Sequence, residues 1–290
     1  MKKPVQRVAA IHDLSGFGRV SLAVVIPILS TMGIQVCPLP TAVLSTHTGS
    51  FKNYKFIDLT THMTEYIAHW KEINIDFDCI YSGFLGSPQQ IDIISHFIDD
   101  FAREDTLVVV DPVMGDGGKL YSSMNQNMVR EMRKYIQKAD LITPNYTEVL
   151  FLLGEKENKT INDDLIKDYL RRLVDMGPRI VIITSVPTRN NTSVTNVIAY
   201  NKDDKRFWKV KCNYIPVYYP GTGDVFTSVV VGSLLQGDSL PIAMDRAVQF
   251  ITAAIRASYG HNYPQRNGIM LERVLGNLTL PVMISSYELL

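Results

Sequence analysis

The sequence predicts an α/β protein in which a mostly parallel central sheet carries helices on both faces. Short apolar, β-branched runs alternate with longer helical patterns along nearly the whole chain, as expected for repeated strand–helix–strand units. The clearest buried strand is residues 107–110, Leu-Val-Val-Val, which ends at Asp111-Pro112. Because no internal repeat or change of composition marks a boundary, we expect residues 1–290 to form one domain.

The composition gives no sign of a charge-driven partner. The chain has 29 Lys plus Arg and 29 Asp plus Glu, so its net charge of zero argues against nucleic acid and anionic membranes as ligands. Its three cysteines are scattered, without the spacing of a zinc site or a disulfide framework. With neither a signal peptide nor a membrane span evident, we expect a cytoplasmic protein.

The apolar patterns place the elements along the chain. We expect strands at 7–11, 35–38, 42–45, 79–82, 107–110, 141–143, 180–184, 194–200 and 206–210, the last two as a hairpin. We expect helices at 21–32, 59–73, 89–102, 127–139, 148–153, 161–176, 225–235 and 241–259. Residues 12–19 and 113–118 are predicted as turns, 46–55 as a loop or flap, and the tail from 260 as loop with one short helix.

The stretch Gly221-Thr222-Gly223-Asp224 carries the most specific chemical signal. Glycines let backbone N–H groups converge on one point, and at a helix N-terminus such groups cradle an anion, typically a phosphate. Asp224, in the first turn, would stand beside that anion, where phosphoryl transfer needs a base. A glycine-rich turn followed by an Asp N-cap would give the same four residues, so that reading stays open.

Polar residues also follow the predicted strands, and in parallel sheets the ligand lies beyond the carboxyl ends of the strands. They are Asp13 and Ser15, His47 and Thr48, Ser82 with the aromatic Phe84, Asp111 and Asp116, Asn145 and Glu148, Thr184 and Ser185. Singly, each has an ordinary explanation, such as a strand terminator, a helix cap, a loop residue or a core aromatic. Jointly they favour a nucleotide-plus-substrate site. The Walker, dinucleotide and protein-kinase signatures are all absent from the chain.

These stretches resemble the ribokinase superfamily and, within it, the pyridoxal (vitamin B6) kinases, over nearly the whole chain. The resemblance is carried by Ser45-Thr46-His47-Thr48-Gly49, Ser82-Gly83-Phe84-Leu85-Gly86-Ser87, Asp111-Pro112-Val113-Met114-Gly115-Asp116, Thr143-Pro144-Asn145-Tyr146-Thr147-Glu148 and Gly221-Thr222-Gly223-Asp224. The last stretch is specific to the superfamily, and the first three together point to the vitamin B6 branch.

The resemblance implies a ribokinase-like three-layer α/β/α sandwich that phosphorylates the 5′-hydroxymethyl group of pyridoxal, pyridoxamine or pyridoxine. It implies ATP and Mg²⁺ as cofactors, is compatible with a monovalent cation such as K⁺, and predicts a homodimer. By the match, Asp224 would be the catalytic base and Gly221, Thr222 and Gly223 the anion hole.

The resemblance also assigns the remaining site residues. Those at the nucleotide, its phosphates and magnesium would be Asp111, Asp116, Thr143, Asn145, Glu148 and Thr184, with Asp111 and Glu148 holding the metal directly or through water. Thr48 and Phe84 would line the pyridine-ring pocket with His47 close by, and a flap at 51–55 would close over it.

The first turn departs from the pyridoxal kinase pattern, in which a serine contacts the ring. Its Asp-x-Ser-Gly, at residues 13–16, is closer to the hydroxymethylpyrimidine kinases of thiamin synthesis. Either Asp13 or Ser15 could make the ring contact. Hydroxymethylpyrimidine or its phosphate is therefore the alternative substrate. A non-catalytic nucleotide or vitamer sensor is a further alternative, although a sensor would not need Asp224.

Overall fold

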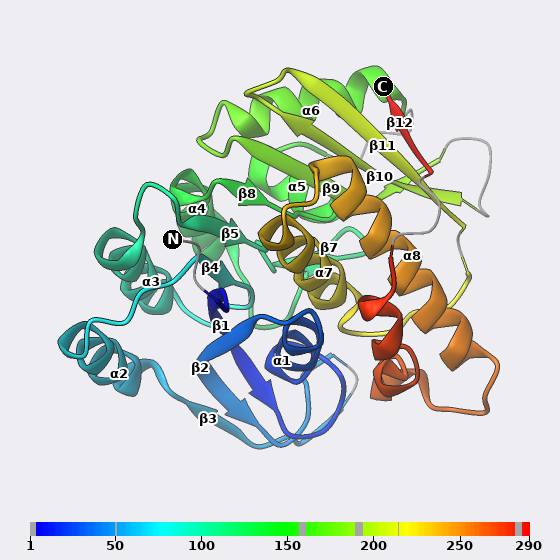
Figure 1. Ribbon diagram of the computed structural model, residues 1–290. Helices are drawn as coiled ribbons and strands as arrows, with labels where there is room; N and C mark the ends of the chain where they lie inside the picture. The colour runs from blue at the N-terminus through cyan, green and yellow to red at the C-terminus, as the bar shows by residue number, and fades with distance from the viewer. Residues whose placement is uncertain (1–3, 50, 157–160, 189–193, 214, 282–285) are drawn as a thin grey trace.

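The predicted three-layer α/β/α architecture is confirmed. The computed structural model describes residues 4–49, 51–156, 161–188, 194–213, 215–281 and 286–290. They form a 10-stranded sheet, with helices packed on both of its faces (Figure 1). The strand order is β12-β11-β10-β9-β8-β5-β4-β1-β2-β3. Pairing is parallel from β2 to β9 and antiparallel at β3 and from β9 to β12, so "mostly parallel" is correct.

The strands of the main sheet are β1 (Arg7–Ser15), β2 (Gln35–Leu44), β3 (Phe56–Asp58), β4 (Cys79–Ser82), β5 (Leu107–Val110), β8 (Leu141–Ile142), β9 (Ile180–Pro187), β10 (Val194–Asn201), β11 (Arg206–Asn213) and β12 (Tyr287–Leu289). A separate short hairpin consists of β6 (Gly115–Asp116) and β7 (Lys119–Leu120).

The helices are α1 (Leu22–Thr31), α2 (Thr60–Glu72), α3 (Pro88–Phe101), α4 (Gln126–Tyr135), α5 (Tyr146–Leu153), α6 (Asp163–Val174), α7 (Thr222–Gln236) and α8 (Leu240–Tyr259). Short 3₁₀ turns are η1 (Ile136–Lys138), η2 (Gln265–Asn267), η3 (Leu271–Arg273) and η4 (Leu275–Thr279). Within the described residues, no helix is long and apolar enough to cross a membrane.

Two hydrophobic cores lie on opposite faces of the sheet. Helices α1, α7 and α8, with the tail turns, enclose one core, and α2 to α6 enclose the other (Figure 1). Because successive strand residues point to opposite faces, β1 contributes Val8 and Ala10 to the first core and Ala9 and Ile11 to the second. Residues 8–11 of β1, 79–81 of β4 and 107–110 of β5 are therefore apolar on both faces of the sheet, as the sequence pattern indicated.

The expectation for the first turn was wrong in part, because β1 continues to Ser15. His12 and Asp13 lie on the strand, where parallel pairing with β2 continues across an irregularity between His12 and Leu14. Such irregularities re-aim side chains next to active sites. The reading of Asp13 and Ser15 as helix caps is also wrong, because the N-cap of α1 is Ser21.

The two strands expected at 35–38 and 42–45 are one strand, β2. Pro38 and Pro40 lie two positions apart, so both of their ring nitrogens face the same side of β2. On the side of β3, pairing is limited to residues 42–44. The prolines therefore interrupt no hydrogen bonds with β3, and a strand tolerates proline in such a setting. The exposed edge strand β3, the β6–β7 hairpin and β12 were not predicted, because they are too short to show a pattern.

Candidate active site

Gly221 is the N-cap of α7 and has a left-handed backbone, with φ of 83°. A Cβ at this position would lie 2.1 Å from the carbonyl oxygen of Arg19, which is far inside contact distance. Residues 222–224 then form the first turn of the helix, so the N–H groups of this loop have no partners inside the helix. The predicted geometry of an anion cradle is present.

Asp224 does not cap this helix. Its Oδ2 accepts the backbone N–H of Ser21 at 2.8 Å. Ser21 in turn donates its hydroxyl to Oδ1 of Asp13 at 2.6 Å, and Ser15 donates to Oδ2 of Asp13 at 3.2 Å. Asp13, Ser15 and Asp224 are thus joined through Ser21, so the first turn and the glycine loop form one polar network.

Burial raises the pKa of Asp224 to about 7, against an ordinary value of 3.8. The hydrogen bond from Ser21 opposes this shift and the charge of Asp13 adds to it. Burial likewise raises the pKa of Asp13, although its two serine partners oppose the shift. A carboxylate with a pKa near 7 accepts a proton more readily than an ordinary aspartate does, which suits a general base.

Asp111 and Glu148 form a second group of buried carboxylates. Burial raises the pKa of Asp111 well above its ordinary value, and the charges of Glu148 and Asp224 raise it further. Burial raises the pKa of Glu148 to about 8. Gly223 lies between the groups, because a Cβ there would be 3.8 Å from Oδ2 of Asp111. This concentration of negative potential beside the cradle favours a cation.

Glu148 also has the structural role that the sequence left open. It forms a capping box with Asn145: Asn145 Oδ1 accepts the N–H of Glu148 at 3.0 Å, and Glu148 Oε2 accepts the N–H of Asn145 at 2.8 Å. Its Oε1 accepts the N–H of Met114 at 3.0 Å. The capping box fixes the start of α5 and directs Glu148 toward Asp111.

The resemblance assigned Thr143 and Thr184 to the nucleotide, and the structure relates Thr143 to Asp111 together with a further threonine, Thr227. Thr227 donates its hydroxyl to Thr143 at 2.9 Å, and both hydroxyls lower the pKa of Asp111. Thr184 is half-buried and forms a bridge with Asn145. Thr143 directly follows β8, whereas Thr184 lies inside β9, because that strand continues past the expected end at residue 184 to Pro187.

Asp116 lies on the β6–β7 hairpin and is exposed. Its charge reaches the same neighbourhood as the buried carboxylates. Burial raises the pKa of Tyr121, and the charges of Glu148, Tyr218, Asp116 and Asp111 all raise it further. The hairpin therefore holds Asp116 at the rim of the carboxylate group.

The predicted ring-pocket residues occupy different settings. His47 is a buried, hydrogen-bonded loop residue: its Nε2–H donates to the carbonyl of Arg266 at 2.6 Å, and its Nδ1 accepts the N–H of Gly49 at 3.2 Å. Thr48 is exposed, and Phe84 is half-buried against the core. His47 thus fastens the loop to the tail of the chain.

The loop predicted as a flap closes β2 onto β3, and Ser50 within it lies outside the described residues. Its Phe51 ring is 5.0 Å from the His47 ring and 5.8 Å from that of Phe17, between centroids. The Arg266 guanidinium lies 5.1 Å from the Phe51 centroid. The loop therefore packs against the first turn, at Phe17, and against the tail of the chain, at Arg266.

Sequence reasoning missed Ser21, Thr227 and His12. Thr227 follows Asp224 by three positions, so helical periodicity alone places it on the same face. His12 Nδ1 lies 4.0 Å from Oδ1 of Asp224. The contacts of Ser21 and His12 with Asp224 join the two ends of the chain, and no local pattern could have indicated them.

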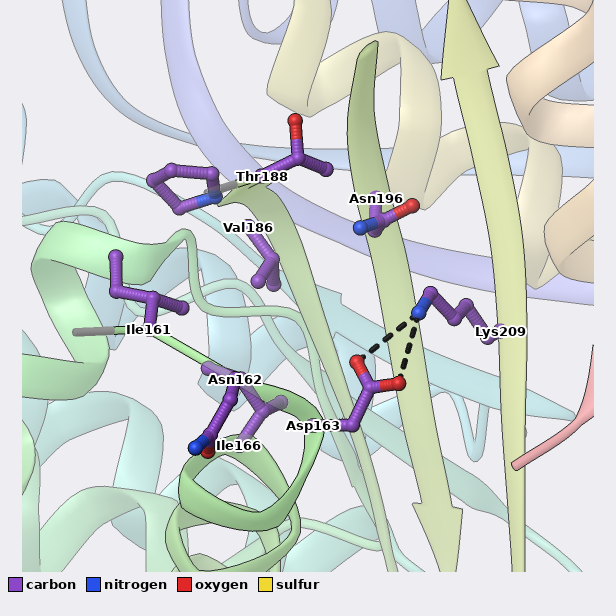
Figure 2. Close-up of a pocket in the computed structure, with 9 residues that line it drawn as sticks. Ile161, Asn162, Asp163, Ile166, Val186, Thr188, Asn196 and Lys209 are labelled. Carbon is purple, nitrogen blue, oxygen red and sulfur yellow. Dashed lines mark hydrogen bonds and ion pairs between the residues drawn. The ribbon is translucent and has the colours of Figure 1, made fainter. Parts of the chain in front are cut away.

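A separate cavity of about 190 Å³ lies between α6 and the strands β9, β10 and β11 (Figure 2). Lys209 donates to both carboxylate oxygens of Asp163 at 3.0 Å, across the space seen in Figure 2. Asn196 Oδ1, on the adjacent strand, is buried without a hydrogen-bond partner among the described residues. The lining includes none of the predicted site residues.

The chain is similar over most of its length to known small-molecule kinases. The family model described as phosphomethylpyrimidine kinase matches residues 27–269. A crystal structure of a candidate phosphomethylpyrimidine kinase from Bacteroides thetaiotaomicron, in a form with pyridoxal, is 57% identical with a TM-score of 0.96, and the match covers 99% of this chain and 100% of that one. The pyridoxal kinase of Lactobacillus plantarum is 30% identical with a TM-score of 0.86, covering 95% and 97%. The pyridoxal kinase of Arabidopsis thaliana is 28% identical over 238 residues, 79% of this chain and 74% of the relative.

Proposed function

This chain belongs to the phosphomethylpyrimidine kinase family, within the ribokinase superfamily, and we propose that it is a vitamin B6 kinase. It transfers the γ-phosphoryl group of ATP to the 5′-hydroxymethyl group of pyridoxal, pyridoxamine or pyridoxine, and residues 1–290 act as a single kinase domain. The Bacteroides structure with pyridoxal and the two pyridoxal kinases favour a pyridine substrate over the pyrimidine of the family name.

The observation that supports catalysis best is the placement of Asp224. Its carboxylate has a pKa of about 7 and lies in the first turn of α7, beside the N–H groups of Gly221 to Gly223. We assign it the role of the base that accepts the proton of the substrate hydroxyl. The loop N–H groups stabilise the charge on the transferring phosphoryl oxygens. A sensor that only binds its ligands would not need a base beside the N–H groups of the loop.

The nucleotide is assigned to the strand ends next to this loop. Thr143 and Asn145 follow β8, Thr184 lies beside Asn145 on β9, and Asp116 lies at the rim. Thr143 is buried against Asp111, whereas Asn145 and Thr184 are half-buried and Asp116 is exposed, which leaves the last three available to a ligand.

The buried carboxylates could hold magnesium together with water and substrate phosphates, without a complete set of protein ligands. The charge of Glu148 raises the pKa of Asp111, and the charge of Asp116 raises that of Glu148, so a nearby cation would stabilise the ionised carboxylates. The described residues contain no group of three or more acidic, His or Cys ligands. Both oxygens of Glu148 already accept backbone N–H groups, so we assign it to the water shell of the metal. Mg²⁺ binding by a few carboxylates, waters and substrate phosphates is usual. When bound, the metal neutralises phosphate charge. A K⁺ requirement stays a prediction.

The substrate ring is assigned to the pocket below the 51–55 loop. Asp13, held by Ser21 and Ser15, presents a buried carboxyl group there, while Thr48 and Phe84 offer a hydroxyl and an aromatic face. We assign the ring contact to Asp13, because Ser15 donates its hydroxyl to Asp13. Closure of the loop would exclude water, so that ATP is transferred to the alcohol and not hydrolysed.

A homodimer is supported by exposed apolar side chains around the edge strand β3. They are Phe56 and Ile57 on β3 and Tyr54 just before it, with Leu14 two strands away on β1. Exposed apolar side chains at a sheet edge are typical of an interface. We propose a cytoplasmic homodimer in which this edge meets its copy.

The proposal is tested by incubating the purified protein with ATP, Mg²⁺ and each vitamer, and following both ADP release and the product mass. Formation of the 5′-phosphate supports it. ATP and vitamer binding without any product would instead identify a sensor.

A further inference from the structure

His12 is a buried histidine that has no hydrogen-bond partner. Its side chain is fully buried, and among the described residues neither ring nitrogen is paired. Buried polar groups are almost always hydrogen-bonded, and exceptions call for an explanation such as a catalytic role. Its ring packs edge-on against that of Tyr81 on β4, with 4.5 Å between the centroids, and this contact satisfies neither nitrogen.

The unpaired nitrogen faces the base. His12 Nδ1 lies 4.0 Å from Oδ1 of Asp224, too far for a hydrogen bond. The other oxygen of Asp224, Oδ2, is already held by the Ser21 N–H at 2.8 Å. Oδ1 is therefore the oxygen to which an additional hydrogen-bond donor could bind, and such a bond would hold the carboxylate in one orientation. Catalytic hydrogen bonds are often long in ligand-free structures and shorten in the reactive complex.

Gly83 makes room for this imidazole. A Cβ at Gly83 would lie 2.3 Å from His12 Nδ1, although Gly83 has no left-handed backbone that would itself require glycine. The glycine after β4 thus provides space for the ring. Burial lowers the pKa of His12 to about 3, so at neutral pH the ring is uncharged and carries one N–H.

We propose that His12 is a positioning residue for the base: its Nδ1–H donates to Oδ1 of Asp224 when substrate and nucleotide fill the site, and so fixes the rotation of the carboxylate. This inference rests on the proposed function of Asp224. With Ser21 holding one oxygen and His12 the other, the remaining lone pairs of the carboxylate face the substrate hydroxyl.

The test uses a matched pair of variants. In His12→Asn the side-chain amide occupies the Nδ1 position and keeps a donor, whereas in His12→Leu a methyl group occupies it. We expect His12→Leu to lower kcat by about 10- to 100-fold, the usual effect of losing a hydrogen bond to a charged group, with KM for ATP and vitamer changed by less than about 3-fold. His12→Asn should recover most of kcat. A kcat within about 2-fold of wild type in His12→Leu, or an equal loss in both variants, would overturn the proposal.

A second measurement needs no activity. The tautomer of His12 is measured by ¹⁵N NMR of the wild-type protein bound to vitamer and a non-hydrolysable ATP analogue. We expect the ring proton on Nδ1. In Asp224→Ala this preference for the Nδ1–H tautomer should be lost. A proton on Nε2 in the wild type would exclude the hydrogen bond. Wild-type turnover of the vitamers tests the proposed function separately, so the failure of one can be told from the failure of the other.

Discussion

The backbone N–H of Ser21 donates to Oδ2 of Asp224 at 2.8 Å, across 203 residues of sequence. Ser21 has a φ of 50°, which is unusual for a residue other than glycine. Strained positions of this kind cost about 1–3 kcal/mol and persist where the surroundings enforce them. The fold accepts this strain at the N-cap of α1, where the chain meets Asp224, the proposed base.

Replacing Asp224 with asparagine should remove the base and keep the fold. The amide oxygen can still accept the Ser21 N–H, and Asp224 has no capping role to lose. Turnover should fall by about 10²- to 10⁴-fold, while ATP binding by calorimetry and both KM values stay close to wild type. If Asp224→Asn retains most of its kcat, Asp224 is not the base.

The pKa of Asp224 gives a pH dependence with opposite signs for activity and stability. Because the base must be ionised, kcat should fall as the pH drops below about 7. The folded protein binds this proton more tightly than the unfolded chain does, so the contribution of Asp224 to stability is present below about pH 4 and is lost as the pH rises through 7.

Asp224→Asn should therefore be more stable than wild type at pH 8, by on the order of 1–4 kcal/mol, and nearly equal to it at pH 4. Thermal or urea unfolding at the two pH values measures this difference. A variant that is less stable at pH 8 would show that the carboxylate is not destabilised in the fold.

Replacing Glu148 with glutamine should raise the Mg²⁺ concentration that gives half-maximal activity, because the site loses negative charge beside Asp111. It should also lower stability by about 1–3 kcal/mol, because the amide nitrogen cannot accept one of the two backbone N–H groups. The matched control is Glu131→Gln, a partly exposed acid of α4 whose ion pairs are with Lys134 and Arg130. Equal Mg²⁺ dependence in both variants would leave Glu148 as a helix cap only.

Gly221→Ala and Gly237→Ala separate crowding from backbone strain. Both glycines have a left-handed backbone, but a Cβ at Gly221 meets Arg19 at 2.1 Å, whereas nothing lies within 4 Å of one at Gly237. We expect Gly237→Ala to lower the free energy of unfolding by about 1–2 kcal/mol and to leave the activity unchanged. Gly221→Ala should lose both stability and turnover. Similar behaviour of the two variants would mean that the close approach of residues 19 and 221 is unimportant.

The sequence predicted the parts of the fold that follow from continuous local patterns. The strands at 79–82 and 107–110 have the predicted bounds, because uninterrupted buried runs end where polar or Pro residues begin. The extension of β1 through His12 and Asp13 was not predicted, since polar residues mark a strand end when only local sequence is considered. Pairing with β2 holds them in the sheet.

The candidate site could be assembled from the rule that parallel strands present their carboxyl ends to one edge. Asp111, Thr143 and Glu148 meet there as predicted. The rule cannot show which of them contact one another, or that the first turn touches the last long helices. Those contacts depend on the packing of α7 against α1, elements separated by most of the chain.

The central claim is most directly tested by measuring kcat/KM for pyridoxal, pyridoxamine, pyridoxine and hydroxymethylpyrimidine side by side, at saturating ATP and Mg²⁺. We predict that at least one vitamer has a specificity constant well above that of hydroxymethylpyrimidine, because the proposed ring pocket would offer Asp13 and the aromatic face of Phe84 to a flat hydroxymethyl-substituted pyridine. A specificity constant for hydroxymethylpyrimidine that is much higher than those of all three vitamers would contradict the account and identify a kinase of thiamin synthesis.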